Sequence, residues 1–493
     1  MSAFARLPEA ERNRLLRRVD WRFLLEHENE PRALAPEESP LARALALVSE
    51  PAVDRPPDLV ALVNPSLHEV EAAAAKLVPG GSLYVEWYRP RLGGRTRLTR
   101  RLEAAGMEGV TWHWPWPPPG RGPAFWLPLD SPEALSFFLG PRRRAEQWWR
   151  RLLAAVWPWA LRLRLLAPLC AVARKKGGLG DARAESASWI LLTGGRRSIN
   201  KVIGFPFVSP ASRPERVVKF ARSSDEEAAL LHEAKILRLL ADSRPRLTGV
   251  PRVLFLERRC GRLGLGETAL EGEPLLTSLD GRTFDRLGTT VTEWLVALAG
   301  ESERRPRTAW RRRLVDEPLE LFARNYSPVV STDEVRRARA ALATLDDLPL
   351  VCEQRDCAPW NVLLAGDRVS VADWESAEES GLPGLDLAYF LVHAALLVAG
   401  VLDRGPVAEH YLDALDPESP RGRTVAKCEA LYCERVGIDA ALMPSLRLLC
   451  WTVHARSEYL RFEADVAAEP PADLLAGGLF LELWRTELAR HEA

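Results

Sequence analysis

The sequence lacks three features that often reveal a protein's class: a surplus of charge, a long apolar run and an ordered set of cysteines. Its 67 Lys and Arg residues balance its 67 Asp and Glu residues, which argues against a general nucleic-acid-binding protein. The N-terminal segment contains no apolar core of signal-peptide length, and no uncharged apolar stretch reaches transmembrane length. The seven cysteines are scattered without metal-ligand spacing, so we expect reduced thiols and a cytoplasmic location.

Tryptophan and proline are unusually frequent, with 17 and 38 residues, and many of them lie between residues 87 and 168. Hydrophobic residues make up 47% and charged residues 27% of the chain, which is the balance of a globular protein. A chain of 493 residues exceeds one ordinary hydrophobic core, so two or three domains are expected.

The first region, residues 1–140, alternates strand and helix patterns. Residues 58–65 (DLVALVNP) predict a buried strand, residues 68–78 (HEVEAAAAKLV) predict a helix, and residues 82–88 (SLYVEWY) predict the next strand. Strands that alternate with helices indicate an α/β unit with a parallel sheet. We therefore expect a partial Rossmann-like domain in this region.

The same region resembles the second half of a class I methyltransferase. The resemblance rests on a helix, a Pro-Gly-Gly turn, a strand, a helix that ends in AAGM at residues 104–107, and the later segment FWLPLD. Those enzymes place a glycine-rich loop after their first strand to bind the cofactor, and residues 1–60 contain no such loop. We expect a degenerate domain with a structural or docking role; retained methyl transfer is the alternative.

Residues 141–186 are expected to connect this domain to the rest of the chain. Residues 141–176 contain ten basic residues against one acid, Glu146, with several tryptophans among leucines. This composition fits an interfacial membrane helix, and therefore a peripheral membrane contact. It also fits a helical linker whose Trp and Leu side chains pack on a neighbouring domain while the arginines face water. We favour the basic, Trp-rich helical linker.

Residues 351–393 contain an acid, an amide and a second acid in a suggestive order. Asp356 precedes Asn361 by five positions, and a short apolar hairpin then leads to Asp373. Phosphoryl transfer from a nucleotide needs one carboxylate to orient the attacking hydroxyl, and an amide oxygen and a second carboxylate to hold Mg²⁺. A loop–strand–turn–strand arrangement would bring the three side chains together. The segment predicts a kinase that uses ATP and Mg²⁺.

Upstream segments supply the other half of such a site. Residues 188–195 predict a strand that runs into a glycine turn, where backbone amides could approach phosphate. The candidates there are Gly194, Gly195, Ser198 and Asn200. Strand 215–221 contains Lys219, and the next helix contains Glu233, with Glu227 as an alternative partner. A lysine–glutamate ion pair would aim the ammonium at the phosphates.

Residues 266–275 (GETALEGEPL) resemble the hinge between the two lobes of a kinase. Backbone groups near Glu267, Ala269 and Leu270 would then meet the edge of the adenine. We therefore expect an α+β two-lobed protein-kinase-like fold, with an N-lobe and hinge at residues 187–275 and a helical C-lobe at residues 276–493.

The catalytic segment resembles the aminoglycoside phosphotransferase and choline kinase family, and the resemblance spans most of residues 187–465. It implies that Asp356 is the catalytic base or the acid that orients the acceptor, that Asn361 and Asp373 hold Mg²⁺, and that Lys219 contacts the phosphates of ATP. The implied reaction is phosphorylation of a hydroxyl on a small molecule, of the aminoglycoside, sugar or amino-alcohol type.

The chain departs from the family at two positions of the loop. The family usually has His-Gly-Asp, and this chain has Gln354, Arg355 and Asp356. Neither changed position supplies the base or a metal ligand, although Arg cannot adopt every backbone geometry open to Gly. A pseudokinase, or a nucleotide-binding scaffold, is therefore the alternative. Asp386 matches a further family acid, and we expect it to give structural support by capping the helix that follows.

Overall fold

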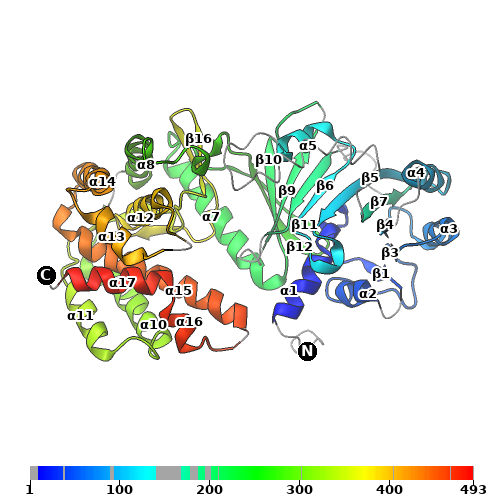
Figure 1. Ribbon diagram of the computed structural model, residues 1–493. Helices are drawn as coiled ribbons and strands as arrows, with labels where there is room; N and C mark the ends of the chain where they lie inside the picture. The colour runs from blue at the N-terminus through cyan, green and yellow to red at the C-terminus, as the bar shows by residue number, and fades with distance from the viewer. Residues whose placement is uncertain are drawn as a thin grey trace. The chain divides into compact units, whose positions relative to one another are not determined.

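The computed structural model divides into two compact units (Figure 1). Unit 1 comprises Met1–Leu231 and Val253–Ala269, and unit 2 comprises His232–Arg252 and Leu270–Ala493. The structure describes residues 9–36, 39–88, 94–139, 168–177, 187–194, 201–208, 210–300, 303–402, 405–466 and 468–491.

Unit 1 is built on one large mixed sheet. Within the described residues the sheet has 12 strands, in the order β11 (Val253–Arg259), β12 (Arg262–Thr268), β10 (Arg216–Ala221), β9 (Lys201–Phe207), β8 (Ser188–Leu192), β6 (Phe125–Pro128), β5 (Met107–Trp116), β7 (Leu169–Lys175), β4 (Ser82–Trp87), β3 (Leu59–Val63), β1 (Arg32–Leu34) and β2 (Glu50–Pro51). Strands β2, β1, β3 and β4, at one edge of the sheet, are parallel to their neighbours in this group. All other neighbouring strands are antiparallel.

The two regions that we expected to be separate domains share this sheet. Strand β6 pairs with β8, with Phe125 opposite Leu192 and Trp126 opposite Leu191. Figure 1 shows the cyan strands of the first region continuing into the green strands of the second. Residues 1–140 and the kinase-like strands are therefore joined by strand pairing as well as by the chain.

The prediction of a helical linker is wrong for its described part. Residues Leu169–Lys175 form strand β7, which lies between β4 and β5. A strand buried on both faces shows no alternation of apolar and polar residues, so its sequence resembles a short buried helix. Residues 140–167 and 178–186 lie outside the described residues, and the expected helix and membrane contact fall mainly there.

Alternating side chains of the sheet build one core on each face. In β4, Leu83 and Val85 enter one core, and Tyr84 enters the other. The first core packs against α3 (Leu67–Lys76), α4 (Gly94–Ala104) and α5 (Pro132–Leu139). The second packs against α1 (Glu9–Arg18), η2 (Asp20–Leu24) and α2 (Pro40–Leu45), and it extends to residues of β9 and β10.

The strands and the helix predicted around residues 58–88 are confirmed as β3, α3 and β4. Helix α3 begins with a capping box, because the Ser66 side chain accepts from the backbone N–H of Glu69 and the Glu69 carboxylate accepts from that of Ser66. Local signals were therefore sufficient for these elements.

Unit 2 is mainly helical. Its helices are α8 (Phe284–Ala299), α9 (Arg307–Arg311), α10 (Glu317–Asn325), α11 (Thr332–Leu342), α12 (Leu385–Ala399), α13 (Val407–Leu415), α14 (Pro420–Val436), α15 (Met443–Val466), α16 (Ala472–Ala476) and α17 (Leu479–Arg490). Helix α7 (Glu227–Ser243) begins in unit 1 and ends in unit 2. Two small sheets have the orders β13 (Glu273–Pro274), β16 (Val362–Ala365), β17 (Arg368–Val371) and β14 (Glu303–Arg304), β15 (Pro349–Glu353), β18 (Glu378–Gly381).

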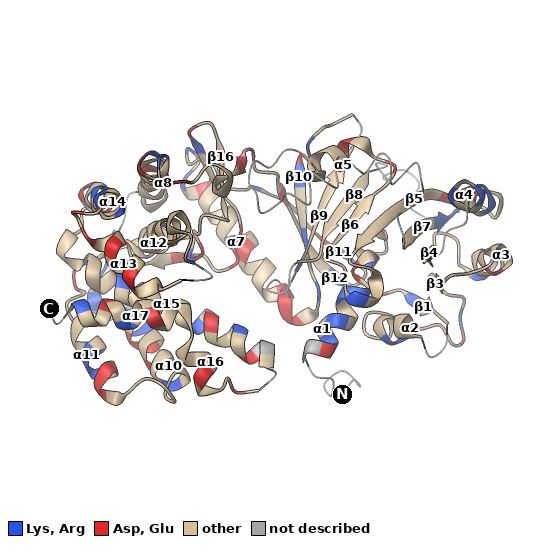
Figure 2. Ribbon diagram, in the orientation of Figure 1, with Lys and Arg blue, Asp and Glu red and all other residues tan. Residues whose placement is uncertain are grey.

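Helix α12 is the buried centre of unit 2. Its residues from Leu385 to Leu396 are all buried, and Asp386 is its one residue among Asp, Glu, Lys and Arg. Figure 2 accordingly shows this helix almost entirely in tan, whereas α4 in unit 1 carries several blue stretches. A helix that is apolar on all sides needs protein around it. In the described parts of the chain, no helix is long and apolar enough to span a membrane.

Candidate active site

The hairpin β16–β17 in unit 2 connects Asn361 to Asp373. Val362 lies opposite Val371, and Ala365 lies opposite Arg368, so two residues make the turn. The Ala372 N–H donates to the Asn361 carbonyl at 2.9 Å and closes the open end of the hairpin. The predicted order of loop, strand, turn and strand is therefore present, and it places Asn361 beside the chain that leads to Asp373.

The Asn361 side chain binds the loop that carries Asp356. Its Nδ2 donates to the Asp356 Oδ2 at 2.8 Å and to the Asp356 backbone carbonyl at 2.9 Å. This contact fixes the carboxylate of Asp356 relative to the hairpin. Because the amide nitrogen is engaged with Asp356, the amide oxygen is the Asn361 atom suited to bind a cation.

Asp356 and Asp373 are close enough to influence one another. Burial and, as the second cause, the nearby charge of Asp373 raise the pKa of Asp356 to about 7, while hydrogen bonds from Asn361 and Tyr389 oppose the rise. Two neighbouring, partly buried carboxylates repel one another, and a bound cation would relieve that repulsion. The structure thus brings Asp356, Asn361 and Asp373 together, as predicted.

Gln354 links the two acidic positions. Its side chain is fully buried, and its Nε2 donates to the Ala372 carbonyl at 3.1 Å and to the Asp373 carbonyl. Its Oε1 accepts from the Asp356 N–H at 2.8 Å. One uncharged amide therefore connects the backbone of Asp356 to the backbone of Asp373. The sequence identified Gln354 only as a departure from the family histidine, and this bridging contact was missed.

Arg355 and Asp373 both have left-handed backbones, each with φ of 65°. Such conformations are uncommon for residues other than Gly, and they disfavour an L-residue by roughly 1–2 kcal/mol. Gly would adopt the geometry at position 355 without strain. In this chain Arg355 adopts it while its Nε donates to the Glu353 Oε2 at 3.1 Å. One strained position directly precedes Asp356 and the other is Asp373 itself, and such strain is commonly found at functional sites.

Asp386 binds the backbone of the loop that carries Asp356. Its carboxylate accepts from the backbone N–H groups of Gln354 at 2.6 Å and Arg355 at 2.8 Å. The N-cap of α12 is Gly384, so our prediction that Asp386 caps this helix is wrong. Its side chain turns to the loop because the buried N–H groups there need an acceptor. Burial raises the pKa of Asp386 to about 6, and the two hydrogen bonds oppose that rise.

Tyr389 is a second residue that the sequence did not single out. Its hydroxyl donates a hydrogen bond to the Asp356 carboxylate, and its ring stacks on His454 with the centroids 3.9 Å apart. It follows Asp386 by three positions on α12, so it lies on the same side of the helix. This spacing from Asp386 was the feature of the sequence that could have identified Tyr389.

Lys219 forms a buried ion pair within unit 1. Its Nζ lies 3.0 Å from the Glu267 Oε1, and each side chain is 5% exposed. Lys219 lies opposite Leu265 in the β10–β12 register, two residues before Glu267, so both charged side chains share one face of the sheet. We expected Glu267 only as a backbone contact in a hinge. Its carboxylate instead joins the lysine strand.

Glu233, the expected partner of Lys219, lies in unit 2. It is fully buried, and its Oε1 accepts from the Trp374 N–H at 2.8 Å, next to Asp373. The pairing of Lys219 with Glu233 joins the two units and stays a prediction.

The remaining candidates are backbone groups. Ala269 donates its N–H to the Glu215 carbonyl at 2.9 Å, so an adenine would meet the Ala269 carbonyl or the backbone of Leu270. Gly194 has a left-handed backbone, with φ of 78°. The candidates Gly195, Ser198 and Asn200 lie outside the described residues. Within the described residues, no group of three or more His, Cys, Asp or Glu side chains could hold a metal ion.

Comparisons with known proteins found similarity for part of the chain. The model of the phosphotransferase enzyme family matches residues 207–423, and a comparison with curated proteins gave no match. Among solved structures, the GDP complex of a mutant aminoglycoside 2'-phosphotransferase-IIIa is 15% identical, with 60% of this chain and 90% of that chain covered and a TM-score of 0.39.

Two further solved structures are similar to a comparable degree. Aminoglycoside phosphotransferase APH(3'')-Id from Streptomyces rimosus, in complex with ADP and streptomycin, is 18% identical, covers 51% of this chain and 90% of its own, and has a TM-score of 0.34. A choline/ethanolamine kinase family protein from Mesorhizobium loti is 15% identical, covers 59% and 89%, and has a TM-score of 0.35. These TM-scores are low, so the similarity that bears on function is the match of residues 207–423 to the phosphotransferase enzyme family.

Proposed function

We propose that the chain transfers a phosphoryl group from ATP to a hydroxyl of a small molecule. The observation that carries the proposal is the contact of the Asn361 amide with the Asp356 carboxylate at 2.8 Å, beside Asp373, inside a phosphotransferase-family domain. We propose an acceptor of the aminoglycoside, sugar or amino-alcohol type, on the strength of the family match.

The residues fit a magnesium ion. The Asn361 amide oxygen and the Asp373 carboxylate are hard oxygen donors, and Mg²⁺ is usually held by one or two carboxylates together with substrate phosphates. The mutual repulsion of Asp356 and Asp373 favours a cation in the same place. When bound, Mg²⁺ would neutralise charge on the phosphates and orient them.

The side chains then have defined roles. Asp356 accepts the proton of the acceptor hydroxyl as the new bond to phosphorus forms and the bond to the departing ADP oxygen breaks. Asn361 and Tyr389 orient the Asp356 carboxylate. Lys219, paired with Glu267, would bind the phosphates. Glu233 and the glycine turn would complete the nucleotide-binding half.

The contacts of Gln354 favour an active enzyme over a pseudokinase. The Asp356 carboxylate is hydrogen-bonded to Asn361, and the buried Gln354 amide joins the Asp356 N–H to the Asp373 carbonyl. These contacts hold both acids in a defined geometry, which we would not expect of a degenerate loop. We propose that Gln354 holds these positions in place of the family histidine.

The experiment is an ATP-consumption screen of the purified protein against a metabolite panel, followed by Asp356→Ala. We expect the variant to lose about 10²–10⁴-fold in kcat, the usual contribution of a general base. Binding of ATP–Mg²⁺ should persist and raise the melting temperature of both proteins. Asp367→Ala, in the exposed hairpin turn, is the matched control. Full activity of Asp356→Ala would refute the assignment, and binding without turnover by the wild type would favour the scaffold.

For the first region we propose a methyltransferase-like domain that has lost its cofactor site. The observations in its support are the parallel pairing of β1, β3 and β4 and the absence of glycine in the segment that follows β1 up to α2. Calorimetric titration of the full chain with S-adenosylmethionine should give no binding. A dissociation constant in the micromolar range would overturn this part of the proposal.

A further inference from the structure

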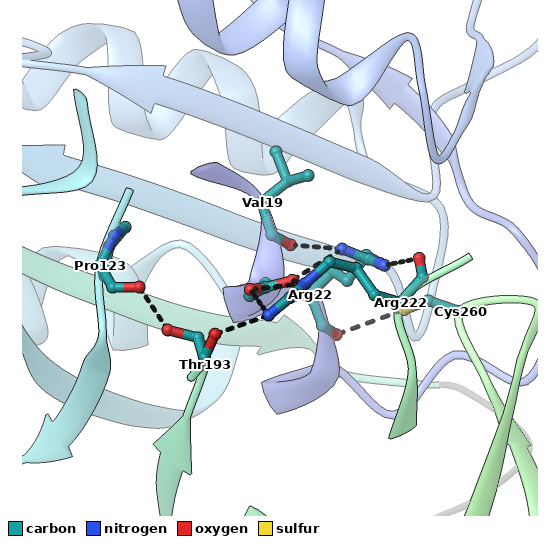
Figure 3. Close-up of polar contacts among 7 residues, drawn as sticks. Val19, Arg22, Pro123, Thr193, Arg222 and Cys260 are labelled. Carbon is teal, nitrogen blue, oxygen red and sulfur yellow. Dashed lines mark hydrogen bonds and ion pairs between the residues drawn. The ribbon is translucent and has the colours of Figure 1, made fainter. Parts of the chain in front are cut away.

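A buried polar cluster connects the N-terminal segment to the kinase-like strands of unit 1 (Figure 3). We call Asp20, Arg22, Thr193 and Arg222 the seam cluster. Asp20 has no exposed surface, and Arg22 and Arg222 are 1% and 2% exposed. Charged groups are rarely buried so completely unless they are paired, so their partners define what the cluster holds together.

Arg222 is the hub of the seam cluster. Its Nε lies 3.1 and 3.2 Å from the two carboxylate oxygens of Asp20, and its Nη2 lies 3.0 Å from the Asp20 Oδ2. The same Nη2 donates to the Thr193 carbonyl at 2.7 Å. Arg22 donates from its Nη2 to the Arg222 carbonyl at 2.8 Å and from its Nη1 to the Val19 carbonyl at 3.2 Å. Both guanidinium groups therefore bind backbone carbonyls of other elements.

Two of these carbonyls, those of Thr193 and Arg222, lie at the ends of strands. Thr193 is the residue after β8 and directly precedes Gly194, where the proposed phosphate-binding turn begins. Arg222 is the residue after β10 and follows Lys219 by three positions. The seam cluster therefore ties together the ends of the two strands from which the proposed nucleotide contacts arise.

A second set of contacts reaches the strand of Glu267. The Cys260 N–H donates to the His27 carbonyl at 2.6 Å, and the Gly261 N–H donates to the Glu28 carbonyl at 2.9 Å. Cys260 and Gly261 form the turn between β11 and β12, and Gly261 has a left-handed backbone with φ of 74°. A Cβ at Gly261 would lie 2.4 Å from the Glu30 side chain, so the two segments pack closely.

We propose that Asp20 and Arg222 are positioning residues for nucleotide binding, and that the N-terminal segment is therefore a working part of the nucleotide-binding half. This inference rests on the proposed function. It goes beyond that function by giving the first region a role: its N-terminal residues keep the start of the glycine turn and the lysine strand in register with one another.

The test is Arg222→Lys in the full chain. Lysine keeps the charge, but it lacks the separate Nε and Nη2 donors through which Arg222 binds the Asp20 carboxylate and the Thr193 carbonyl. We expect the dissociation constant for ATP–Mg²⁺, measured by calorimetry, to rise at least tenfold. Asp20→Asn should give a similar rise. Arg101→Lys, at the exposed ion pair with Glu71, is the matched control and should leave the constant unchanged.

The outcomes separate the two proposals. If the wild type does not bind ATP–Mg²⁺, the proposed function fails. If the wild type binds and a folded Arg222→Lys variant binds equally well, the positioning role is wrong while the function stands. If neither seam variant folds, hydrogen exchange of the wild type decides: ATP–Mg²⁺ should slow exchange of the amides of residues 19–25, and unchanged exchange there would overturn the inference.

Discussion

Two carboxylates of unit 1 and two of unit 2 differ in the groups that bind them. In unit 1, Glu86 pairs with Arg18 and Asp20 pairs with Arg222, and none of these four side chains is more than 8% exposed. In unit 2, Asp386 is buried and Asp356 is partly buried, and their hydrogen bonds come from amide, hydroxyl and backbone groups. Burial accordingly raises the pKa of Asp356 to about 7 and that of Asp386 to about 6.

The difference shows how partner choice decides what a buried acid can do. A guanidinium neutralises a carboxylate and fixes two elements together. Neutral hydrogen-bond donors orient a carboxylate but leave its charge available to a proton or a cation. Glu86 and Asp20 therefore fit a role in holding elements together, and Asp356 fits the proposed catalytic role.

The largest expected effect is on the stability of unit 1. Arg18→Met would leave Glu86 charged and buried without its guanidinium, and such a change lowers the free energy of unfolding by about 3–5 kcal/mol. Urea unfolding at pH 7 would measure the loss. Arg101→Ala, at the exposed Glu71 pair, should lower it by less than about 1 kcal/mol. Equal losses in the two variants would show that the buried Arg18–Glu86 pair stabilises unit 1 no more than an exposed pair does.

The next effect is on activity in unit 2. In Gln354→Glu the side chain keeps its size, but at neutral pH it cannot donate to the carbonyls of Ala372 and Asp373. Leaving such buried groups unsatisfied costs about 1–3 kcal/mol, so we expect kcat to fall about 10–100-fold. A protonated Glu can donate, so part of the activity should return as the pH falls.

The control for this change is Gln354→His, which restores the residue usual in the family and should stay within about tenfold of the wild type, since one hydrogen bond is worth about 1 kcal/mol. Wild-type activity of Gln354→Glu at pH 8 would show that the amide is not needed to hold Asp356 and Asp373.

The smallest effect concerns pH. Burial lowers the pKa of His454 to about 3, below the value of about 6.5 in an unfolded chain. Below pH 6.5 the unfolded state therefore binds a proton that the folded state does not, and the free energy of unfolding falls as the pH falls. At pH 5.5 this contribution is about 1.4 kcal/mol.

His454→Phe keeps a ring against Tyr389 but cannot be protonated. Between pH 7 and pH 5.5, its free energy of unfolding should fall less than that of the wild type by about 1.3 kcal/mol. The groups that face His454, namely His393 and Arg355, remain in the variant and affect both proteins alike. Identical pH slopes for the two proteins would show that His454 does not titrate as described.

Several parts of the molecule were legible in the sequence. Turn residues and helix periodicity marked β3, α3 and β4, and the spacing of Asp356, Asn361 and Asp373 predicted their meeting, because a two-residue hairpin must return the chain to its starting point. The structure corrected the helical linker at β7 and the capping role of Asp386. In both cases a local pattern was compatible with two partners, and contacts distant in sequence chose between them.

The sequence by itself determined the order of the acids, the amide and the lysine strand, since spacing along the chain is enough to place residues at the ends of adjacent strands. Only the tertiary structure decided that Gln354 bridges Asp356 and Asp373, that Lys219 pairs with Glu267, and that Asp20 reaches Arg222 across 202 positions. The physical reason is that each buried polar group takes its partner from whatever element packs beside it, and no local pattern records that neighbour.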